Sequence, residues 1–536
     1  MKRWVGYIAG FCCVVMAVKS TAQIPVGAAD KGNGFYQNPV LHADYSDPDA
    51  IRVGNQYYMT ASSFTHIPGL PLLQSSDMVN WKLVGHALPR LQPIEHYSKV
   101  QHGAGVWAPS IRFHKGEFYI YFPDPDFGIY VIKARNFQGP WSEPVLVEAG
   151  KGLIDPCPLW DDDGKVYLAH AFAGSRAGIK SVLVVKEMNA AGTKTIGSGV
   201  MVFDGHPQDP TVEGPKLYKR NGYYYIFAPA GGVSTGWQLV LRSKNIYGPY
   251  ERKVVMDQGK SSINGPHQGA WVTAADGKDW FLHFQDKEAY GRIVHLQPMV
   301  WKNDWPVIGA DADNDGVGEP VIQFKKPVAA VVIEAPPTSD EFNTALLGKQ
   351  WQWQANPDIT WAFPTTQGYL RMFAVYRADS LTNAWDYPNL LAQKFPAESF
   401  TATVKLRFAA TKNNEQAGFM VHGADYAFLG LTQKDGITSI QYHERLNADK
   451  NKPEKITALG TVEGQDIFLR LVVAPGAKCR FAFSADGKTF TEAPHVFTAK
   501  PGRWVGAKFG FFINRNTVTN DGGYIDIDWI RIQALQ

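Results

Sequence analysis

Three acidic residues and one histidine stand in short motifs that could carry chemistry. Asp47 lies in YSDPDA, Asp155 in LIDPCP, Glu213 in TVEGPK and His267 in GPHQGA. Each motif precedes a turn and a strand-like run of aromatic residues. Asp-Pro and Gly-Pro are common turn dipeptides. Their recurrence at one phase of a repeat nevertheless predicts that the four side chains occupy equivalent places in successive units and converge.

Three carboxylates at one pocket suit the cleavage of a glycosidic bond. One carboxyl must be protonated to give its proton to the leaving oxygen, and another must be ionised to act on water or on the sugar. The two pKa values therefore have to be pushed apart, and a third carboxylate helps by keeping the acid protonated. Because three crowded acids disfavour folding, a purely structural role is the weaker interpretation.

The elements that position these residues form an internal repeat. Aromatic runs follow Gly, Asn or Asp turns at GNQYYMTAS, KGEFYIYF, DGKVYLAH, NGYYYIF and DGKDWFLHF. Five units of about 55 residues, each with several strands, predict a five-bladed β-propeller over residues 33–325. The innermost strand of each blade begins beside the central axis, so the motifs should meet at one mouth of that axis.

The rest of the chain predicts a second all-β domain. Residues 326–338 form a Pro- and Ala-rich linker, and alternating runs such as FTATVKLRF and IFLRLVV follow it. This pattern predicts an antiparallel β-sandwich over residues 339–536. Cys157 and Cys479 fall in different domains, so we expect free thiols rather than a disulfide.

The N-terminus has the pattern of a secretory signal peptide, residues 1–22, with cleavage after Ala22. Its apolar run is short for a membrane anchor, and no other segment is long and apolar enough to span a bilayer. Removing it takes away two Lys, one Arg and no acidic residue, so the formal charge falls from +3 to zero. A neutral chain argues against a nucleic-acid partner. Export, most simply to the periplasm, is the expected location.

The motifs resemble those of glycoside hydrolase family 43, which contains β-xylosidases and α-L-arabinofuranosidases on a five-bladed propeller. The resemblance begins at NPVLHADYSDPDA and continues through GVWAPSIRF, GLIDPCPLW, EGPKLYKRN, GPHQGAW and YGRIVHLQ. The later region, from DEFNTALLGKQ to IDWIRI, is similar to the jelly-roll or concanavalin-like sandwich found in one branch of the family.

The resemblance implies a role for each carboxylate. Asp47 matches the general base, Glu213 the general acid, and Asp155 the carboxylate that orients the site and raises the pKa of the acid. The family inverts the anomeric centre, which implies base and acid carboxyls about 6.5–9.5 Å apart. No cofactor is required for this chemistry.

Further residues match the family's sugar pocket. Arg292 resembles the arginine that reaches the terminal sugar, with a surface ion pair as the alternative. Phe64 and Trp107 resemble aromatic residues that line the pocket, and blade packing is the alternative for Trp107. His102 is a weaker candidate for the pocket. His267 matches a histidine on the axis beside a bound cation, for which a structural calcium ion is the candidate.

Two acidic patterns raise the question of further calcium sites. The loop at residues 311–316 resembles the start of an EF-hand, but Ile322 stands where the bidentate Glu belongs, so a solvated turn is the preferred interpretation. In the sandwich, Glu341 and Asp528 are a hypothetical pair that could share a calcium ion across the sheet edge.

The preferred functional prediction is an exo-acting α-L-arabinofuranosidase that trims plant cell-wall polysaccharides such as xyloglucan or arabinoxylan, or their oligosaccharides. A β-xylosidase on the same scaffold is the alternative enzyme. A carbohydrate-binding protein is the alternative from another class, although binding needs no proton donor. A fructan-cleaving propeller hydrolase is disfavoured, because SDPDA replaces that group's opening motif. We further hypothesise that the sandwich closes the pocket, with residues 507–516 supplying a loop to its rim.

Overall fold

The computed structural model describes residues 24–328, 332–462 and 466–535. The predicted signal peptide lies outside the described residues. No helix within the described ranges is long and apolar enough to cross a lipid bilayer. The short helices are α1 (Ile94–Tyr97) and α2 (Gly174–Ala177), with 3-10 turns η1 (Glu288–Tyr290), η2 (Ala384–Asp386) and η3 (Ala448–Lys450).

The N-terminal domain is a β-propeller of five 4-stranded antiparallel sheets, which confirms the predicted fold. The first two blades are β2 (Asp49–Val53), β3 (Gln56–Thr60), β4 (Gly69–Ser75) and β5 (Trp81–Leu88), and β6 (Ser110–His114), β7 (Glu117–Asp124), β8 (Gly128–Ala134) and β9 (Val145–Ala149). The third is β10 (Leu153–Trp160), β11 (Val166–Phe172), β12 (Val182–Met188) and β13 (Thr195–Asp204). The last two are β14 (Lys216–Arg220), β15 (Tyr223–Ala230), β16 (Trp237–Ser243) and β17 (Glu251–Met256), and β18 (His267–Thr273), β19 (Asp279–Asp286), β20 (Arg292–Lys302) and β21 (Trp305–Ile308).

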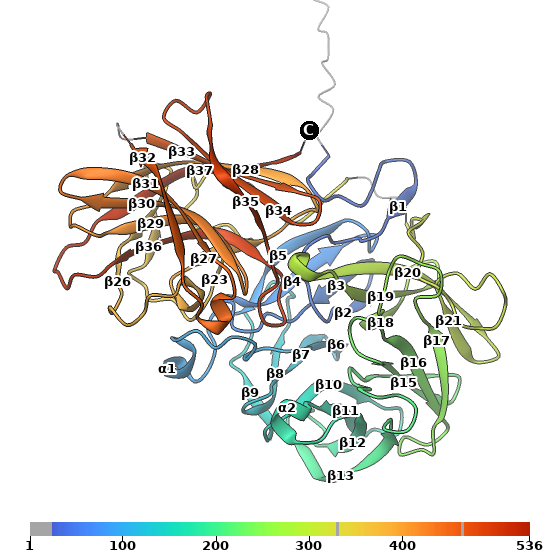
Figure 1. Ribbon diagram of the computed structural model, residues 1–536. Helices are drawn as coiled ribbons and strands as arrows, with labels where there is room; N and C mark the ends of the chain where they lie inside the picture. Colours follow the sequence, from blue (N-terminus) through green and yellow to red (C-terminus); the bar gives the residue numbers. More distant parts are fainter. Residues whose placement is uncertain (1–23, 329–331, 463–465, 536) are drawn as a thin grey trace, which may run out of the picture.

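Each blade is a meander in which sequence order equals spatial order, because short turns join neighbouring antiparallel strands. The aromatic runs that revealed the repeat are the second strands β3, β7, β11, β15 and β19. They are largely buried, since both faces of a blade pack against neighbouring blades. The ring is joined at Leu41, which pairs with Val294 of β20, and β1 (Phe35–Gln37) pairs with β22 (Gln323–Lys325). Figure 1 shows β2, β6, β10 and β18 facing the centre of the ring.

The C-terminal domain is a β-sandwich of an 8-stranded and a 7-stranded sheet. The larger sheet contains β23 (Gln352–Trp353), β27 (Leu391–Lys394), β36 (Lys508–Arg515), β29 (Gln416–His422), β30 (Tyr426–Lys434), β31 (Ile437–Arg445) and β32 (Lys455–Thr461), with β26 (Val375–Tyr376) beside β36. The smaller contains β24 (Ala362–Pro364), β25 (Leu370–Phe373), β37 (Tyr524–Ala534), β28 (Phe400–Ala409), β33 (Asp466–Ala474), β34 (Lys478–Ser484) and β35 (Thr491–Thr498).

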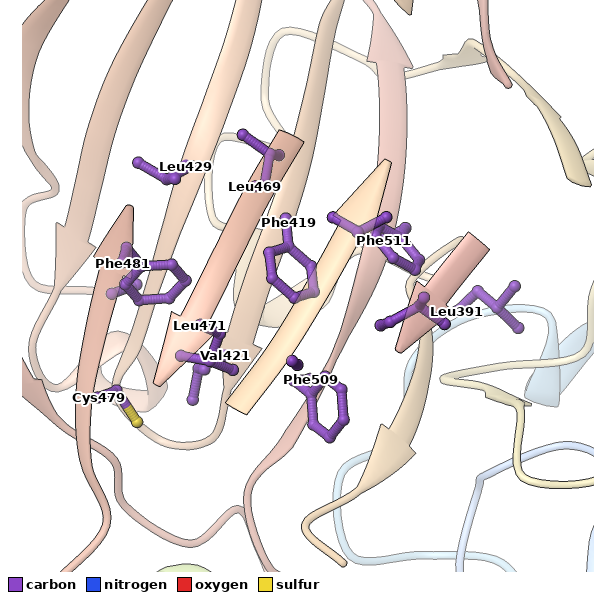
Figure 2. Packing of buried hydrophobic residues seen from close by; sticks show 14 of the residues in the cluster. Leu391, Phe419, Val421, Leu429, Leu469, Leu471, Cys479, Phe481, Phe509 and Phe511 are labelled. Atoms are coloured by element: carbon purple, nitrogen blue, oxygen red, sulfur yellow. The ribbon is translucent and has the colours of Figure 1, made fainter. Parts of the chain in front are cut away.

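The alternation of apolar and polar residues creates the sandwich core. In β33, DIFLRLVVA buries every second side chain, as expected of a strand with one face on a core. Phe419, Phe509 and Phe511 of the larger sheet meet Leu471 and related side chains of the smaller one (Figure 2). Cys479 is buried in this core and Cys157 in the propeller, and both are free thiols as expected.

The sandwich lies beside the propeller (Figure 1), and backbone and side-chain hydrogen bonds join the two domains. Ile67, before β4, exchanges two backbone hydrogen bonds with Trp353 of β23. The Asn356 side chain accepts the Leu91 N–H at 2.9 Å and donates to the Leu91 carbonyl at 2.9 Å. Tyr290 is buried in the sandwich core and donates to the Glu398 carbonyl. These contacts join the two domains at three places.

Candidate active site

One mouth of the propeller axis opens into a pocket of about 680 Å³. Asp47 and Glu213 lie just before β2 and β14, Asp155 lies near the start of β10, and His267 begins β18. All four line this pocket, together with Arg292, Phe64 and Trp107. The structure thus brings together all the residues that the sequence analysis assigned to the catalytic and sugar-binding pocket, except His102.

The backbone at three of these residues is unusual, and Phe64 has a φ of 51°. Asp47 and Asp155 have φ values of 54° and 58°, in the left-handed region that Asp tolerates better than most side chains. Asp155 also lies within a bulge of β10, between the paired residues Ile154 and Cys157. A bulge removes a residue from the regular ladder and redirects its side chain. Sites that hold such conformations are often functional.

Asp47 is surrounded by donors. The Ser46 and Ser62 hydroxyls donate to its Oδ2 at 2.6 and 2.5 Å. The Arg292 Nη1 lies 3.3 Å from its Oδ1 and also donates to the Ser46 hydroxyl at 2.9 Å. Both oxygens therefore act as acceptors, and the carboxylate is held in a fixed position on the pocket floor.

Glu213 has the opposite environment. Burial and the neighbouring Asp155 carboxylate raise the pKa of Glu213 from 4.5 to about 8. Its side chain is 25% exposed, and it lines the pocket. A carboxyl that is still protonated at neutral pH and faces a ligand pocket is suited to donate a proton.

Asp155 is the buried neighbour that keeps Glu213 protonated. Burial raises the pKa of Asp155 as well, to about 7, while the Gly214 N–H donates to its Oδ2 at 2.7 Å and favours its charged form. Glu213 receives no such backbone donor among the described residues. We therefore place the proton on Glu213 and the negative charge on Asp155.

Arg292 is buried in the pocket wall, which overturns the alternative of a surface ion pair. Its guanidinium lies 4.9 Å from the centre of the Phe284 ring. Phe64 and Trp107 form another part of the wall, with ring centres 6.3 Å apart. Both interpretations of Trp107, as a pocket residue and as a residue that packs the blades, are correct: it lines the pocket and also packs against the core between the third and fourth blades.

His102 does not line the pocket. Its ring stacks on Trp385 of the sandwich at 3.7 Å, and its Nε2 lies 3.2 Å from the Asp386 carboxylate. It therefore belongs to the contact between the domains.

His267 is buried on the axis, with its Nε2 3.5 Å from Glu213 Oε1. Burial and the charge of Arg292 lower its pKa to about 3, so the imidazole is neutral. Neither ring nitrogen has a hydrogen-bond partner among the described residues, which leaves both able to meet a ligand. Calcium takes six to eight oxygen ligands, whereas within the described ranges His267 joins no group of three metal-ligating side chains. An ion here would depend mainly on water.

The other two acidic patterns also have defined surroundings. In the EF-hand-like loop, the Asp311 carboxylate accepts from Lys302 Nζ at 2.8 Å. The shared calcium site in the sandwich stays a hypothesis. Glu341 pairs with Arg531 at 2.8 Å, and Asp528 pairs with Lys405 at 2.9 Å, so a cation already lies beside each carboxylate.

A sandwich residue that the sequence analysis missed completes the pocket. Trp504 lines it, with its ring centre 6.4 Å from that of Trp107. The Gly506 N–H donates to Asp44 Oδ2 at 2.9 Å, and the Arg292 N–H donates to Asp44 Oδ1 at 2.9 Å. The predicted rim segment 507–516 is instead mostly the buried strand β36, and the preceding loop reaches the pocket. The only sequence signal was an aromatic residue between glycines in PGRWVG.

Comparisons with known proteins agree with this architecture. Residues 36–306 match the family model for glycosyl hydrolases family 43, and residues 339–533 match the beta xylosidase C-terminal concanavalin A-like domain. A putative beta-xylosidase of Xylanibacter ruminicola is 40% identical over 90% of this chain and 87% of its own length. A beta-xylosidase of Formosa agariphila is 33% identical over 95% and 92%.

Two further similar proteins extend the comparison. A non-reducing end alpha-L-arabinofuranosidase of Bacteroides ovatus is 30% identical over 75% of this chain and 76% of its own length. Among solved structures, a GH43 protein of Bacillus licheniformis is 26% identical, with a TM-score of 0.80 over 94% of this chain and all of that one.

Proposed function

The chain belongs to glycoside hydrolase family 43, and from this premise we propose that it is an exo-acting, inverting glycosidase that releases single terminal pentose residues from plant cell-wall oligosaccharides or polysaccharides. The observation that carries the proposal is the contrast between two carboxyls in one pocket. Glu213 has a pKa raised to about 8, and Asp47 is held by hydroxyl and guanidinium donors. This is the division of labour that inversion requires.

In the proposed reaction, Glu213 gives its proton to the glycosidic oxygen as the bond from that oxygen to the anomeric carbon breaks. Asp47 takes a proton from the water whose oxygen forms the new bond to the anomeric carbon from the opposite face. Arg292 holds Asp47 in place and faces the sugar. Asp155 stays negative and keeps Glu213 protonated. Exchange with solvent then removes the proton from Asp47 and restores the proton on Glu213.

The exo mode is supported by the walls of the pocket. Phe64 and Trp107 come from the propeller, and Trp504 comes across from the sandwich. An aromatic wall can pack on the C–H face of a sugar ring while polar groups select its hydroxyls. A pocket closed on the sandwich side favours a chain end over the middle of a polymer.

We place β-D-xylosides first and α-L-arabinofuranosides second as substrates. Two relatives, 40% and 33% identical, carry the name beta-xylosidase. The arabinofuranoside predicted from the sequence has the support of the 30% identical relative from Bacteroides ovatus. Export to the periplasm stays a prediction.

The test compares 4-nitrophenyl β-D-xylopyranoside and α-L-arabinofuranoside, xylobiose, and an arabinofuranosyl oligosaccharide. We expect E213Q to lose about 10²–10⁴-fold on the oligosaccharide and much less on the nitrophenyl glycoside, whose leaving group needs little protonation. D47N should lose activity on both. The matched controls E143Q and D379N change exposed carboxylates and should retain activity.

Proton NMR of the first product formed reports its anomeric configuration. Retention of configuration, or full activity of E213Q on xylobiose, would refute the proposed roles. Binding of every oligosaccharide without turnover would favour a carbohydrate-binding protein.

A further inference from the structure

The opposite mouth of the propeller axis holds a second pocket, of about 460 Å³. The active-site residues stand at the beginnings of the inner strands, whereas this pocket is formed by later residues of the same strands. Its lining comprises residues 50–52 of β2, 112–114 of β6, 158–160 of β10, 217–219 of β14 and 271–273 of β18. The two pockets therefore lie at opposite ends of the axis, and a ligand in one leaves the other open.

Aromatic rings form much of the wall of the second pocket. Tyr218 and Trp271 meet edge to face, with ring centres 5.2 Å apart. Trp160 stacks on His114 at 4.6 Å, with an angle of 12° between the rings. Phe113 packs on Phe118, with ring centres 4.8 Å apart, and is still 41% exposed, so part of its ring faces the pocket. Flat apolar faces of this kind pack against the C–H surface of sugar rings.

The charge of this mouth is the reverse of that at the active site. Its lining includes Arg52, Arg112 and Lys219 and no acidic residue. Arg112 is bound by the buried Asp49 carboxylate at 2.8 Å. Lys219 is bound by Asp161 and lies 3.3 Å from Asp162. The charges of Arg112 and Lys219 are therefore largely neutralised by these carboxylates, which do not line the pocket.

Arg52 differs from the other two cations. Its Nε donates to the Thr273 carbonyl at 2.9 Å, and its Nη1 donates to the Gly54 carbonyl at 2.9 Å. Throughout the described part of the chain, no carboxylate forms an ion pair with it. Two neutral carbonyls thus hold the guanidinium at the pocket rim, and no carboxylate of the described residues lies within ion-pair distance of it, although Asp279 binds the neighbouring Thr273 and Trp271 side chains. A fixed guanidinium with free N–H groups is suited to a carboxylate ligand.

We propose that this mouth binds a carboxylate-bearing sugar unit of an acidic oligosaccharide, with the carboxylate on Arg52 and the sugar ring against the aromatic wall near Phe113. A uronic acid combines the two features that the pocket recognises, a negative charge and a ring with an apolar face. The active-site pocket, with three carboxyls on its floor, disfavours the same unit. The proposal goes beyond glycoside hydrolysis and does not depend on which pentose the active site releases.

The test is calorimetric titration of the full-length E213Q variant with trigalacturonic acid and with a glucuronosyl xylotriose, which distinguish the two uronic acids. Xylotriose and inorganic phosphate are the comparison ligands. R52Q removes the charge, F113A removes the exposed ring, and R135Q is the control, since Arg135 is 90% exposed outside the pocket. Melting temperature, measured for each variant, verifies folding.

We expect at least one uronic-acid oligosaccharide to bind and R52Q and F113A each to weaken that binding at least tenfold. R135Q should have no effect, and R52Q in the otherwise native chain should hydrolyse neutral substrates at the normal rate. No binding of either acidic oligosaccharide would overturn the proposal. Binding that R52Q leaves unchanged would overturn it as well. Equally tight binding of phosphate, unaffected by F113A, would identify a simple anion site and refute the proposed recognition of a sugar ring.

Discussion

The pH dependence of activity provides a direct test of the role given to Asp155. An ordinary glutamic acid with a pKa of 4.5 would be protonated in about 0.3% of molecules at pH 7, whereas a pKa of about 8 keeps about 90% protonated. The environment of Glu213 thus increases the proton-loaded form about 300-fold. Because the proposed reaction needs that proton, kcat/KM should fall as the pH rises through about 8.

D155N removes the negative charge and should lower the pKa of Glu213. Asn is the matched substitution, because it also tolerates the left-handed backbone that Asp155 adopts, with φ 58°. Burial is the largest cause of the raised pKa of Glu213 and persists in the variant, so we expect this pKa to fall only partly, to about 7. The protonated fraction would then fall about fivefold at pH 8 and hardly at all at pH 6.

The assay is the pH profile of kcat/KM on xylobiose, or on an arabinofuranosyl oligosaccharide if that is the better substrate. Nitrophenyl glycosides are unsuitable, because their cleavage needs little acid catalysis. The fivefold extra loss at pH 8 relative to pH 6 is separate from any uniform loss caused by misplacement of the sugar. A uniform loss with the alkaline limb unmoved would refute the electrostatic role of Asp155. D379N serves as the exposed control.

Three other perturbations test the surroundings of the site. W504A should raise KM about fivefold with little change in kcat, because it removes about 1 kcal/mol of aromatic packing on the sugar. W529A, on the outer face of the sandwich, should change neither parameter, and equal kinetics of the two variants would contradict a role for Trp504. D44A should lower the free energy of unfolding by about 2–3 kcal/mol and also raise KM, since Asp44 accepts two buried N–H groups, one from the loop at Gly506. Urea unfolding measures the first effect and steady-state kinetics the second. An unchanged KM would show that the position of this loop does not affect substrate binding. Exhaustive dialysis against EDTA should leave kcat/KM within about twofold, because water would supply most ligands of an ion at His267. A loss of activity that added calcium restores would instead show that the ion is needed for catalysis.

The domain architecture could be predicted from the sequence because local patterns determine it. Alternation with period two and turn residues between aromatic runs specify hairpins. Five repeated units of this kind can bury both faces of each sheet when the units are arranged around one axis. The same repeat phase located Asp47, Asp155, Glu213 and His267, since equivalent residues of a ring converge. Arg292, Phe64 and Trp107 were located through resemblance of motifs, and the structure places them in the same pocket.

Other features depend on the tertiary structure. Trp504 reaches the pocket from a domain that begins far along the chain, and only the docking of the sandwich through contacts such as Asp44 with Gly506 brings it there. The pairing of Glu341 with Arg531, and of Asp528 with Lys405, depends on side-chain direction at a sheet surface, which sequence spacing does not encode. The sequence by itself determined which residues could do chemistry and that they meet on one axis. The tertiary structure decided their protonation and the closure of the pocket, because burial, charge and packing are sums over neighbours that lie close only in the folded chain.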